Sequence, residues 1–334
     1  MRITRDQLIS TAKDTVKRET FGTNDLVCAY ITGSLTREEP LIGGTTDIDL
    51  IYVHSLETIQ RREIVPITDE FHLDISHFPQ SYFRQPRELR ADAWVGSFLC
   101  DYPILLHDTN HWFDFVRSGA FAHFFSPANA ILRVRPFIES ARAGWLKLST
   151  GQIPAHREAV RVYLQTLKDA ANAVACVHSV PLTDRRLVLD FPAAAQALNM
   201  PGLAGGLVDL IVPPDPIEPD WDEWLRHWGI AFSSIQGAAG QPLSFTDSRR
   251  PYYERAIRAL SADNSPSALW LLLRSWSRMG AFLPEHNSSQ SGYDAVLSQV
   301  ALGQDDFSTR LSALDLFLDT TEEAIDAWQA SSGI

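Results

Sequence analysis

Residues 30–53, YITGSLTREEPLIGGTTDIDLIYV, contain the pattern that decides how the first half of the chain folds. Two aspartates, Asp47 and Asp49, interrupt a run that otherwise has the apolar composition of a buried strand. Side chains alternate along a strand, so the two carboxylates share one face while Ile48 and Leu50 point to the other. Neighbouring carboxylates repel each other and resist burial, and a divalent cation between them relieves the repulsion. An edge strand with one face in water is the ordinary alternative.

The flanking sequence favours a functional site over a solvated strand edge. The apolar segment 26–32 leads directly into Gly33 and Ser34. Gly33 permits a tight turn, and Ser34 offers a hydroxyl and begins a segment whose N–H groups can cradle phosphate. A later apolar segment, 71–78, carries one acid, Asp74. If that segment pairs beside the aspartate strand, the three carboxylates form a two-metal site for phosphoryl or nucleotidyl transfer.

The order of these motifs resembles the nucleotidyltransferase superfamily of DNA polymerase β. ITGS (31–34) is followed after a gap of twelve residues by DIDL (47–50), and then by an acid in HLDIS (72–76). The resemblance covers roughly residues 25–108. Small members of this superfamily that modify antibiotics, or transfer AMP to proteins, follow the domain with a helical bundle, and the layout here is similar.

The resemblance implies a role for each motif residue. Asp47 and Asp49 would bind Mg²⁺ or Mn²⁺. Asp74 would be the third metal ligand and, in some members, the catalytic base that receives the proton of the acceptor hydroxyl. Gly33 and Ser34 would hold the β- and γ-phosphates of the incoming nucleotide.

Two cations are further candidates for nucleotide binding. The loop 36–46 is acidic because of Glu38 and Glu39, which oppose a triphosphate, and Arg37 is its only cation. Arg37 is therefore the candidate phosphate partner within the loop. Lys168 lies in a helical segment of the second half, and a lysine reaches the triphosphate in antibiotic-modifying relatives. A solvated helical lysine is the ordinary alternative for that residue.

The first half of the chain alternates between helical and strand-like patterns, which predicts an α/β domain with a mixed sheet. Helices are predicted at 4–20, 56–65 and 86–99, strands at 26–32, 47–54 and 71–78, and a short apolar segment ending in a turn at 102–108. We expect this nucleotidyltransferase domain to span residues 1–125.

The second half, residues 126–334, has apolar residues at helical spacing and predicts an all-α domain. Helices are predicted at 127–149, 155–179, 184–198, 201–211, 220–234, 251–262, 265–281 and 306–330, and connectors rich in Pro, Gly, Ser or Asp at 212–220, 233–251 and 284–292.

Composition limits the classes of function. The 334 residues are 45% hydrophobic and carry a net charge of −12, which argues against binding to long nucleic acid. No apolar run approaches the roughly 18 residues of a membrane span, and the first residues lack the apolar core of a signal peptide. Cys28, Cys100 and Cys176 are far apart in apolar surroundings and are interpreted as buried free thiols, so we expect a cytoplasmic protein.

The leading hypothesis is a metal-dependent nucleotidyltransferase that uses Mg²⁺ or Mn²⁺ to transfer AMP from ATP, or a nucleotide from another triphosphate, to a hydroxyl. The acidic composition suits a small cationic acceptor such as an aminoglycoside. The alternatives are a protein AMP-transferase of the toxin–antitoxin type and a degenerate nucleotide-binding or interaction module. Polymerase or tRNA end-processing activity is disfavoured because the sequence has no strong basic stripe.

Overall fold

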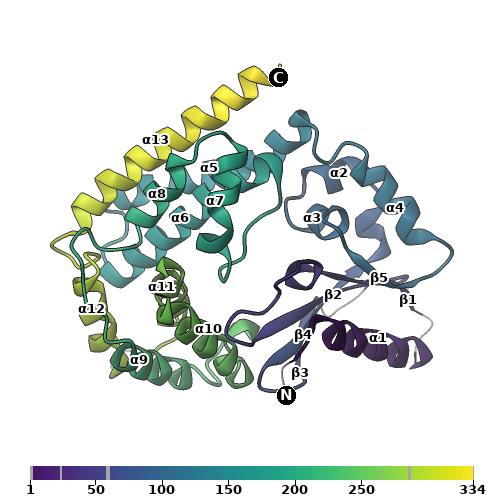
Figure 1. The fold of residues 1–334 in the computed structure, drawn as a ribbon, viewed down its shortest axis with the longest axis horizontal. Coiled ribbons are helices and arrows are strands. Elements are labelled where there is room, and N and C mark those ends of the chain that lie inside the picture. Colours follow the sequence, from purple (N-terminus) through teal and green to yellow (C-terminus); the bar gives the residue numbers. More distant parts are fainter. Residues whose placement is uncertain (1–2, 23–24, 58–60, 264, 285–286, 334) are drawn as a thin grey trace. The chain divides into compact units, whose positions relative to one another are not determined.

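A computed structural model of the chain describes residues 3–22, 25–57, 61–263, 265–284 and 287–333 (Figure 1). The chain divides into two compact units, residues 1–129 and 130–334. A mixed five-stranded sheet with helices forms the first unit, and the regular elements of the second unit are helices. The predicted fold class, an α/β domain followed by an all-α domain, is confirmed.

The sheet of the first unit places the strand of Asp47 and Asp49 between the strand that precedes Gly33 and the strand that carries the third acid. Its strands are β1 (Leu26–Thr32), β2 (Thr46–His54), β3 (Arg62–Pro66), β4 (Phe71–Pro79) and β5 (Ile104–Asp108), in the spatial order β3-β4-β2-β1-β5. β2 and β4 run parallel, whereas the other neighbours are antiparallel. β2 therefore lies between β1, which leads directly into Gly33, and β4, which contains Asp74.

Helices cover both faces of this sheet. The helices are α1 (Arg5–Gly22), α2 (Pro86–Ala91), α3 (Val95–Cys100) and α4 (Trp112–Phe121). Figure 1 shows α1 on one side of the sheet and α2, α3 and α4 on the other. Ile48 and Leu50 share an apolar core with α1, whereas Ile51 belongs to the core formed with the other three helices. By alternation, Asp47 and Asp49 belong to the same face as Ile51, at the end of β2 where that core stops.

Two predictions in the first unit were wrong in their local structure. The segment 56–65 was predicted as a helix, but residues 62–66 form the edge strand β3, and residues 58–60 lie outside the described residues. β-branched residues and a terminal proline suit such an edge. The single helix predicted at 86–99 is two helices, because the Asp92 carboxylate accepts hydrogen bonds from the backbone N–H groups of Trp94 and Val95 and starts a new helix.

The segment predicted at 102–108 contains β5, and α4 was not predicted. β5 pairs antiparallel with β1. The cysteines are buried free thiols, as expected. Among the described residues, no helix has both the length and the apolar character that crossing a bilayer requires.

The second unit follows the predicted series of helices with one exception. The helices are α5 (Pro127–Ser149), α6 (His156–His178), α7 (Leu187–Ala197), α8 (Gly202–Asp209), α9 (Trp221–Ser234), α10 (Arg250–Ala262), α11 (Pro266–Gly280), α12 (Ser289–Gln299) and α13 (Phe307–Ser331). α12 begins inside the predicted connector 284–292, so that prediction was wrong for its last residues. The first residues of α12 are polar and resemble a connector, but the helix buries Tyr293, Val296 and Leu297 further along.

Candidate active site

The parallel register of β2 and β4 brings the three predicted aspartates together on one face of the sheet. Asp74 is directly paired with Asp49, and His72 is paired with Asp47. Paired residues of neighbouring strands project from the same face, as do residues two apart on one strand. Asp47 and Asp74 are buried, with 6% and 7% of their surface exposed, and Asp49 is half-buried. Three acids therefore share one patch of the sheet.

Gly33 lies against the second of these acids. Its predecessor on β1, Thr32, is paired with Asp49, and the 3₁₀ turn η1 (Gly33–Thr36) begins directly afterwards. Gly33 has φ = +72°, and a Cβ placed on it would overlap the Oδ2 atom of Asp49. Only glycine meets both the left-handed backbone and the close approach of the carboxylate without strain.

The turn that follows Gly33 is fixed from two sides. The Ser34 Oγ atom lies 2.9 Å from the Oγ1 atom of Thr46, the residue before Asp47, and either hydroxyl can donate. From α1, the Arg5 guanidinium donates to the carbonyl oxygen of Leu35 at 2.8 Å. Ser34 is therefore held at the start of the aspartate strand, where the sequence predicted a phosphate-binding hydroxyl.

Arg37 closes this turn, since its backbone N–H donates to the Ser34 carbonyl at 3.1 Å. Its charge acts on Asp101, a carboxyl group whose pKa is raised by burial and lowered less strongly by Arg37. Arg37 is half-buried, while Glu38 and Glu39 are exposed. Its predicted contact with a nucleotide phosphate stays a prediction.

The glycine pair in the loop between the motifs forms a tight turn. Gly43 and Gly44 have φ values of +61° and +72°. Ile42 and Thr45 close the turn through two backbone hydrogen bonds of 3.1 Å each. A two-residue turn with positive φ at both positions favours glycine, so the pair directs the chain back into β2.

Arg62 is a residue of this patch that the sequence analysis missed. Its Nε and Nη2 atoms donate to Oδ1 and Oδ2 of Asp74 at 2.8 and 2.5 Å. Ile64 is paired with Asp74 across β3 and β4, and Arg62 lies two residues away on the same face. Because residues 56–65 were predicted as a helix, Arg62 was not expected on a strand beside Asp74. The two β-branched residues Ile64 and Val65, followed by Pro66, are the signal that would have indicated an edge strand.

One of the three carboxylates of the patch is covered by a guanidinium. Carboxylate oxygens are the ligands that a hard cation such as Mg²⁺ prefers, and Asp47 and Asp49 project from one face of the sheet. Both oxygens of Asp74 accept hydrogen bonds from Arg62. Over the described ranges, no group of three or more His, Cys, Asp or Glu side chains is placed to hold a metal ion. The metal role predicted for all three aspartates stays a prediction, and it requires Arg62 to release Asp74.

His72, which neighbours Asp74 on β4, is fully buried beneath the patch. Its Nδ1 atom lies 3.8 Å from the Oδ1 atom of Asp47, beyond hydrogen-bond length. The buried imidazole therefore lies on the same face of the sheet as Asp47 and Asp74.

Lys168, the predicted cation of the second half, has a partner within its own unit. Its Nζ atom lies 2.6 Å from the Oδ1 atom of Asp184. The same carboxylate is contacted by Arg274, at 3.5 Å from Oδ1, and by Arg278, at 2.9 Å from Oδ2. Burial raises the pKa of Asp184, but the three cations outweigh it and the net pKa is well below its ordinary value. The proposed contact of Lys168 with a triphosphate stays a prediction.

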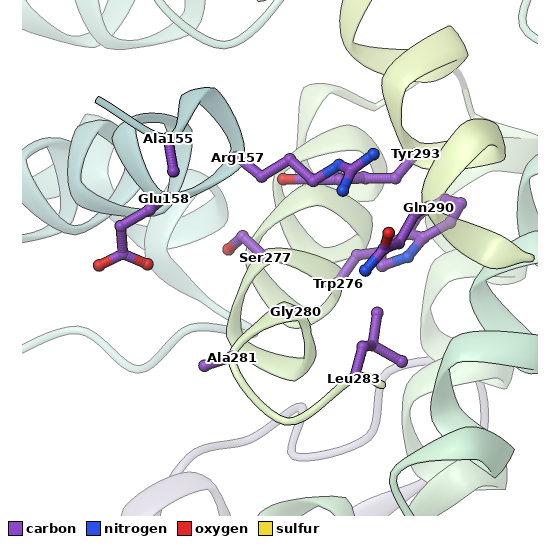
Figure 2. Close-up of a pocket in the computed structure, with 10 residues that line it drawn as sticks. All are labelled: Ala155, Arg157, Glu158, Trp276, Ser277, Gly280, Ala281, Leu283, Gln290 and Tyr293. Carbon is purple, nitrogen blue, oxygen red and sulfur yellow. The ribbon is translucent and has the colours of Figure 1, made fainter. Parts of the chain in front are cut away.

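The second unit also contains a cavity of about 220 Å³ between residues of α6, α11 and α12 (Figure 2). The rings of Trp276 and Tyr293 line it with their centroids 5.1 Å apart. Figure 2 shows Arg157 beside Tyr293, with Leu283 on the other side of the hollow. Its lining includes none of the residues predicted to bind the nucleotide or a metal.

Comparisons with known proteins leave the function to be argued from these residues. No protein-family model and no curated protein matches the chain. Among solved structures, the chain is similar to a nucleotidyltransferase-like protein from Exiguobacterium sibiricum 255-15, with 8% sequence identity and a TM-score of 0.33. The similarity covers 94% of this chain and 91% of that one. A similarity this distant is too weak to indicate a function.

Proposed function

We propose that this protein is a metal-dependent nucleotidyltransferase that moves AMP from ATP to a hydroxyl group. The single observation that carries the proposal is the acidic patch, in which Asp47, Asp49 and Asp74 share a face and Gly33 packs against Asp49. Clustered carboxylates cost stability, so a site that gathers them has a functional reason for doing so.

The residues of the patch divide the work of such a transfer. Asp47 and Asp49 would hold a Mg²⁺ ion, which when bound neutralises charge on the α-phosphate and the leaving pyrophosphate. The Ser34 hydroxyl and the N–H groups of η1 would donate to the β- and γ-phosphate oxygens, and Gly33 lets the backbone approach them. The acceptor oxygen bonds to the α-phosphorus as the bond to pyrophosphate breaks. The hydroxyl proton passes to a base. Asp74 is the candidate, and Arg62 would have to release one of its oxygens for it to act.

The acceptor that fits the chain best is a small cationic molecule with a free hydroxyl, such as an aminoglycoside. The net charge of −12 attracts a cationic acceptor toward the protein. This part of the proposal depends on charge alone and is tested separately from nucleotide binding.

Nucleotide binding is tested by thermal unfolding with ATP and Mg²⁺. At 100 times the dissociation constant a ligand stabilises the folded state by about 2.7 kcal/mol, which raises the melting temperature measurably. We expect the increase to require Mg²⁺, to be lost in Asp47→Ala, and to persist in Asp69→Ala, which alters an exposed aspartate of the same unit. No increase with any of the four ribonucleoside triphosphates, with either Mg²⁺ or Mn²⁺, would sink the proposal.

Transfer is then tested with ATP labelled in the α-phosphate. An aminoglycoside panel and a cell extract are incubated with the protein and labelled ATP in separate reactions. Label on a small molecule supports the proposed acceptor class, whereas label on a protein band replaces it with protein AMP-transfer. We expect Asp49→Asn to abolish labelling while leaving the folded structure unchanged, because it removes a metal ligand but keeps the side-chain shape.

A further inference from the structure

Arg62 and Asp74 are held together by the sheet itself. β3 pairs antiparallel with β4 in a register that sets Ile64 opposite Asp74 and Arg62 opposite Ser76. The arginine side chain therefore reaches the carboxylate diagonally across two neighbouring strands, within the range of a long side chain. No loop rearrangement is needed to form the pair, so it belongs to the fold of the unit.

The geometry of the pair is that of a strong charge-assisted contact. The guanidinium donates to both carboxylate oxygens, at 2.8 and 2.5 Å, in the parallel two-bond arrangement that suits these groups. The Asp74 side chain is 7% exposed, whereas the Arg62 side chain is 49% exposed. Little of the carboxylate surface is therefore open to a further ligand, while the cation that covers it faces the solvent.

A divalent cation bound to Asp74 would meet this guanidinium at short range. Two positive charges a few ångströms apart repel each other, and the repulsion is strong beside a buried carboxylate because the local dielectric is low. Asp47 and Asp49 lie on the neighbouring strand, and their carboxylates are of the type that a single hard cation would use as ligands. The residues present thus disagree with a site of two metal ions held by three carboxylates.

We propose that Arg62 takes the place of one of the two metal ions, so that the site binds a single divalent cation on Asp47 and Asp49. This inference rests on the proposed function and specifies which positive charges balance the three carboxylates of that site. The guanidinium neutralises Asp74 and supplies a fixed positive charge on the acidic face. The site would then respond to the concentration of one metal ion only.

The test counts the Mn²⁺ ions bound to the full-length protein, by isothermal titration and by the loss of the free-Mn²⁺ paramagnetic resonance signal, with a non-hydrolysable ATP analogue present. We expect one Mn²⁺ per chain in the wild type and two in Arg62→Met, which keeps the apolar stem but removes the charge. Arg62→Lys keeps a charge and should still bind one. Arg61→Met alters the adjacent exposed arginine and is the matched control, with one ion expected.

Each outcome separates this inference from the proposed function. Two ions in the wild type, or one ion in Arg62→Met, overturn the role of Arg62 and leave metal-dependent transfer standing. No ion in any variant overturns both. Far-ultraviolet circular dichroism and the urea midpoint identify a variant that fails to fold. If Arg62→Met fails in this way, Arg62→Gln replaces it, with the same two-ion outcome expected.

Discussion

Two carboxylates with little solvent exposure, one in each unit, have different charged surroundings. In the first unit, Asp74 shares a face of the sheet with two further aspartates and is bound by one guanidinium. In the second unit, a single carboxylate, Asp184, is contacted by Lys168, Arg274 and Arg278. One region gathers acids and the other gathers cations around an acid.

This difference in surrounding charge indicates that the Asp184 cluster stabilises the fold, whereas the three aspartates of the first unit form the proposed binding site. A buried carboxylate surrounded by cations is compensated, and its net pKa is lowered despite burial. Several carboxylates on one face repel one another in the folded state, so their placement opposes stability unless a ligand joins them. We therefore expect substitutions at Asp184 to act mainly on folding and substitutions at Asp47 and Asp49 to act mainly on binding.

The largest expected effect is that of Asp184→Ala. It leaves three cations around an empty position, and removing one partner of a buried ion pair costs about 3–5 kcal/mol. Urea unfolding should therefore show a large loss of stability. Asp294→Ala breaks the exposed pair with Arg157, in which both side chains are over 40% exposed, and should cost less than about 1 kcal/mol. Equal losses in the two variants would mean that the Asp184 cluster does not stabilise the unit.

A smaller effect is expected of Gly33→Ala, for which the chain offers a close control. Gly33 and Gly44 share a φ of +72°, but only at Gly33 would a Cβ meet other atoms, those of the Asp49 side chain. Gly44→Ala should cost about 1–2 kcal/mol from the left-handed backbone alone. Gly33→Ala should cost more, up to about 3 kcal/mol, and should also weaken Mn²⁺ binding because Asp49 must move. Indistinguishable urea midpoints and Mn²⁺ affinities would show that the contact between Gly33 and Asp49 is loose.

The sequence predicts the parts of the fold in which local pattern and tertiary structure agree. β1, β2 and β4 are found within a residue or so of the predicted strands, because apolar and β-branched residues dominate each of them. The shared face of Asp47 and Asp49 follows from strand alternation alone. The position of Asp74 beside them follows only if β4 pairs with β2, which is a long-range contact that the pattern suggests but does not determine.

The sequence does not predict partners that depend on pairing between distant elements. Arg62 lies in a short edge strand whose residues also fit a helical pattern, so its contact with Asp74 was concealed. Nothing in the sequence distinguishes Lys168 from other half-exposed helical lysines, because its partner Asp184 comes near it only when the unit folds. In both cases the decisive contact joins residues at least twelve positions apart in the sequence.

The smallest expected effect concerns a chain of titratable groups at the other end of the sheet. His54 Nδ1 lies 3.0 Å from Asp25 Oδ2, His54 Nε2 lies 2.9 Å from His77 Nδ1, and His77 Nε2 lies 3.3 Å from Glu63 Oε1. His77 therefore has one ring nitrogen facing a second imidazole and the other facing a carboxylate.

This arrangement predicts how stability changes near neutral pH. Burial lowers the pKa of His77 below its ordinary 6.5, against the opposing effects of Glu63 and of Glu19 on α1, while His54 adds to the decrease. Between the lowered pKa and 6.5 the unfolded chain binds more protons than the folded one. Stability therefore rises with pH across that window and is reduced when the pH falls below it.

Asp184 has the same direction of pH dependence at a lower pH, which gives the stability profile an acid limb besides the rise near pH 6. Its pKa is lowered by Lys168, Arg274 and Arg278, so its stabilisation is present above 3.8 and is lost as the pH falls toward its folded value. Urea midpoints measured from pH 3 to 8 should show both limbs in the wild type.

Substituting one group at a time should remove one limb at a time. His77→Gln should reduce the rise near pH 6 and leave the acid limb. A residual rise is expected, because burial also lowers the pKa of His178 in the second unit. Asp184→Asn should reduce the acid limb and leave the rise near pH 6. A residual acid limb is expected, because burial raises the pKa of Asp25 but hydrogen bonds from Ser55 and Leu56 outweigh it and lower the net pKa. An unchanged rise in His77→Gln would mean that His77 takes up its proton as readily in the folded protein as in the unfolded chain, contrary to the pKa that burial lowers.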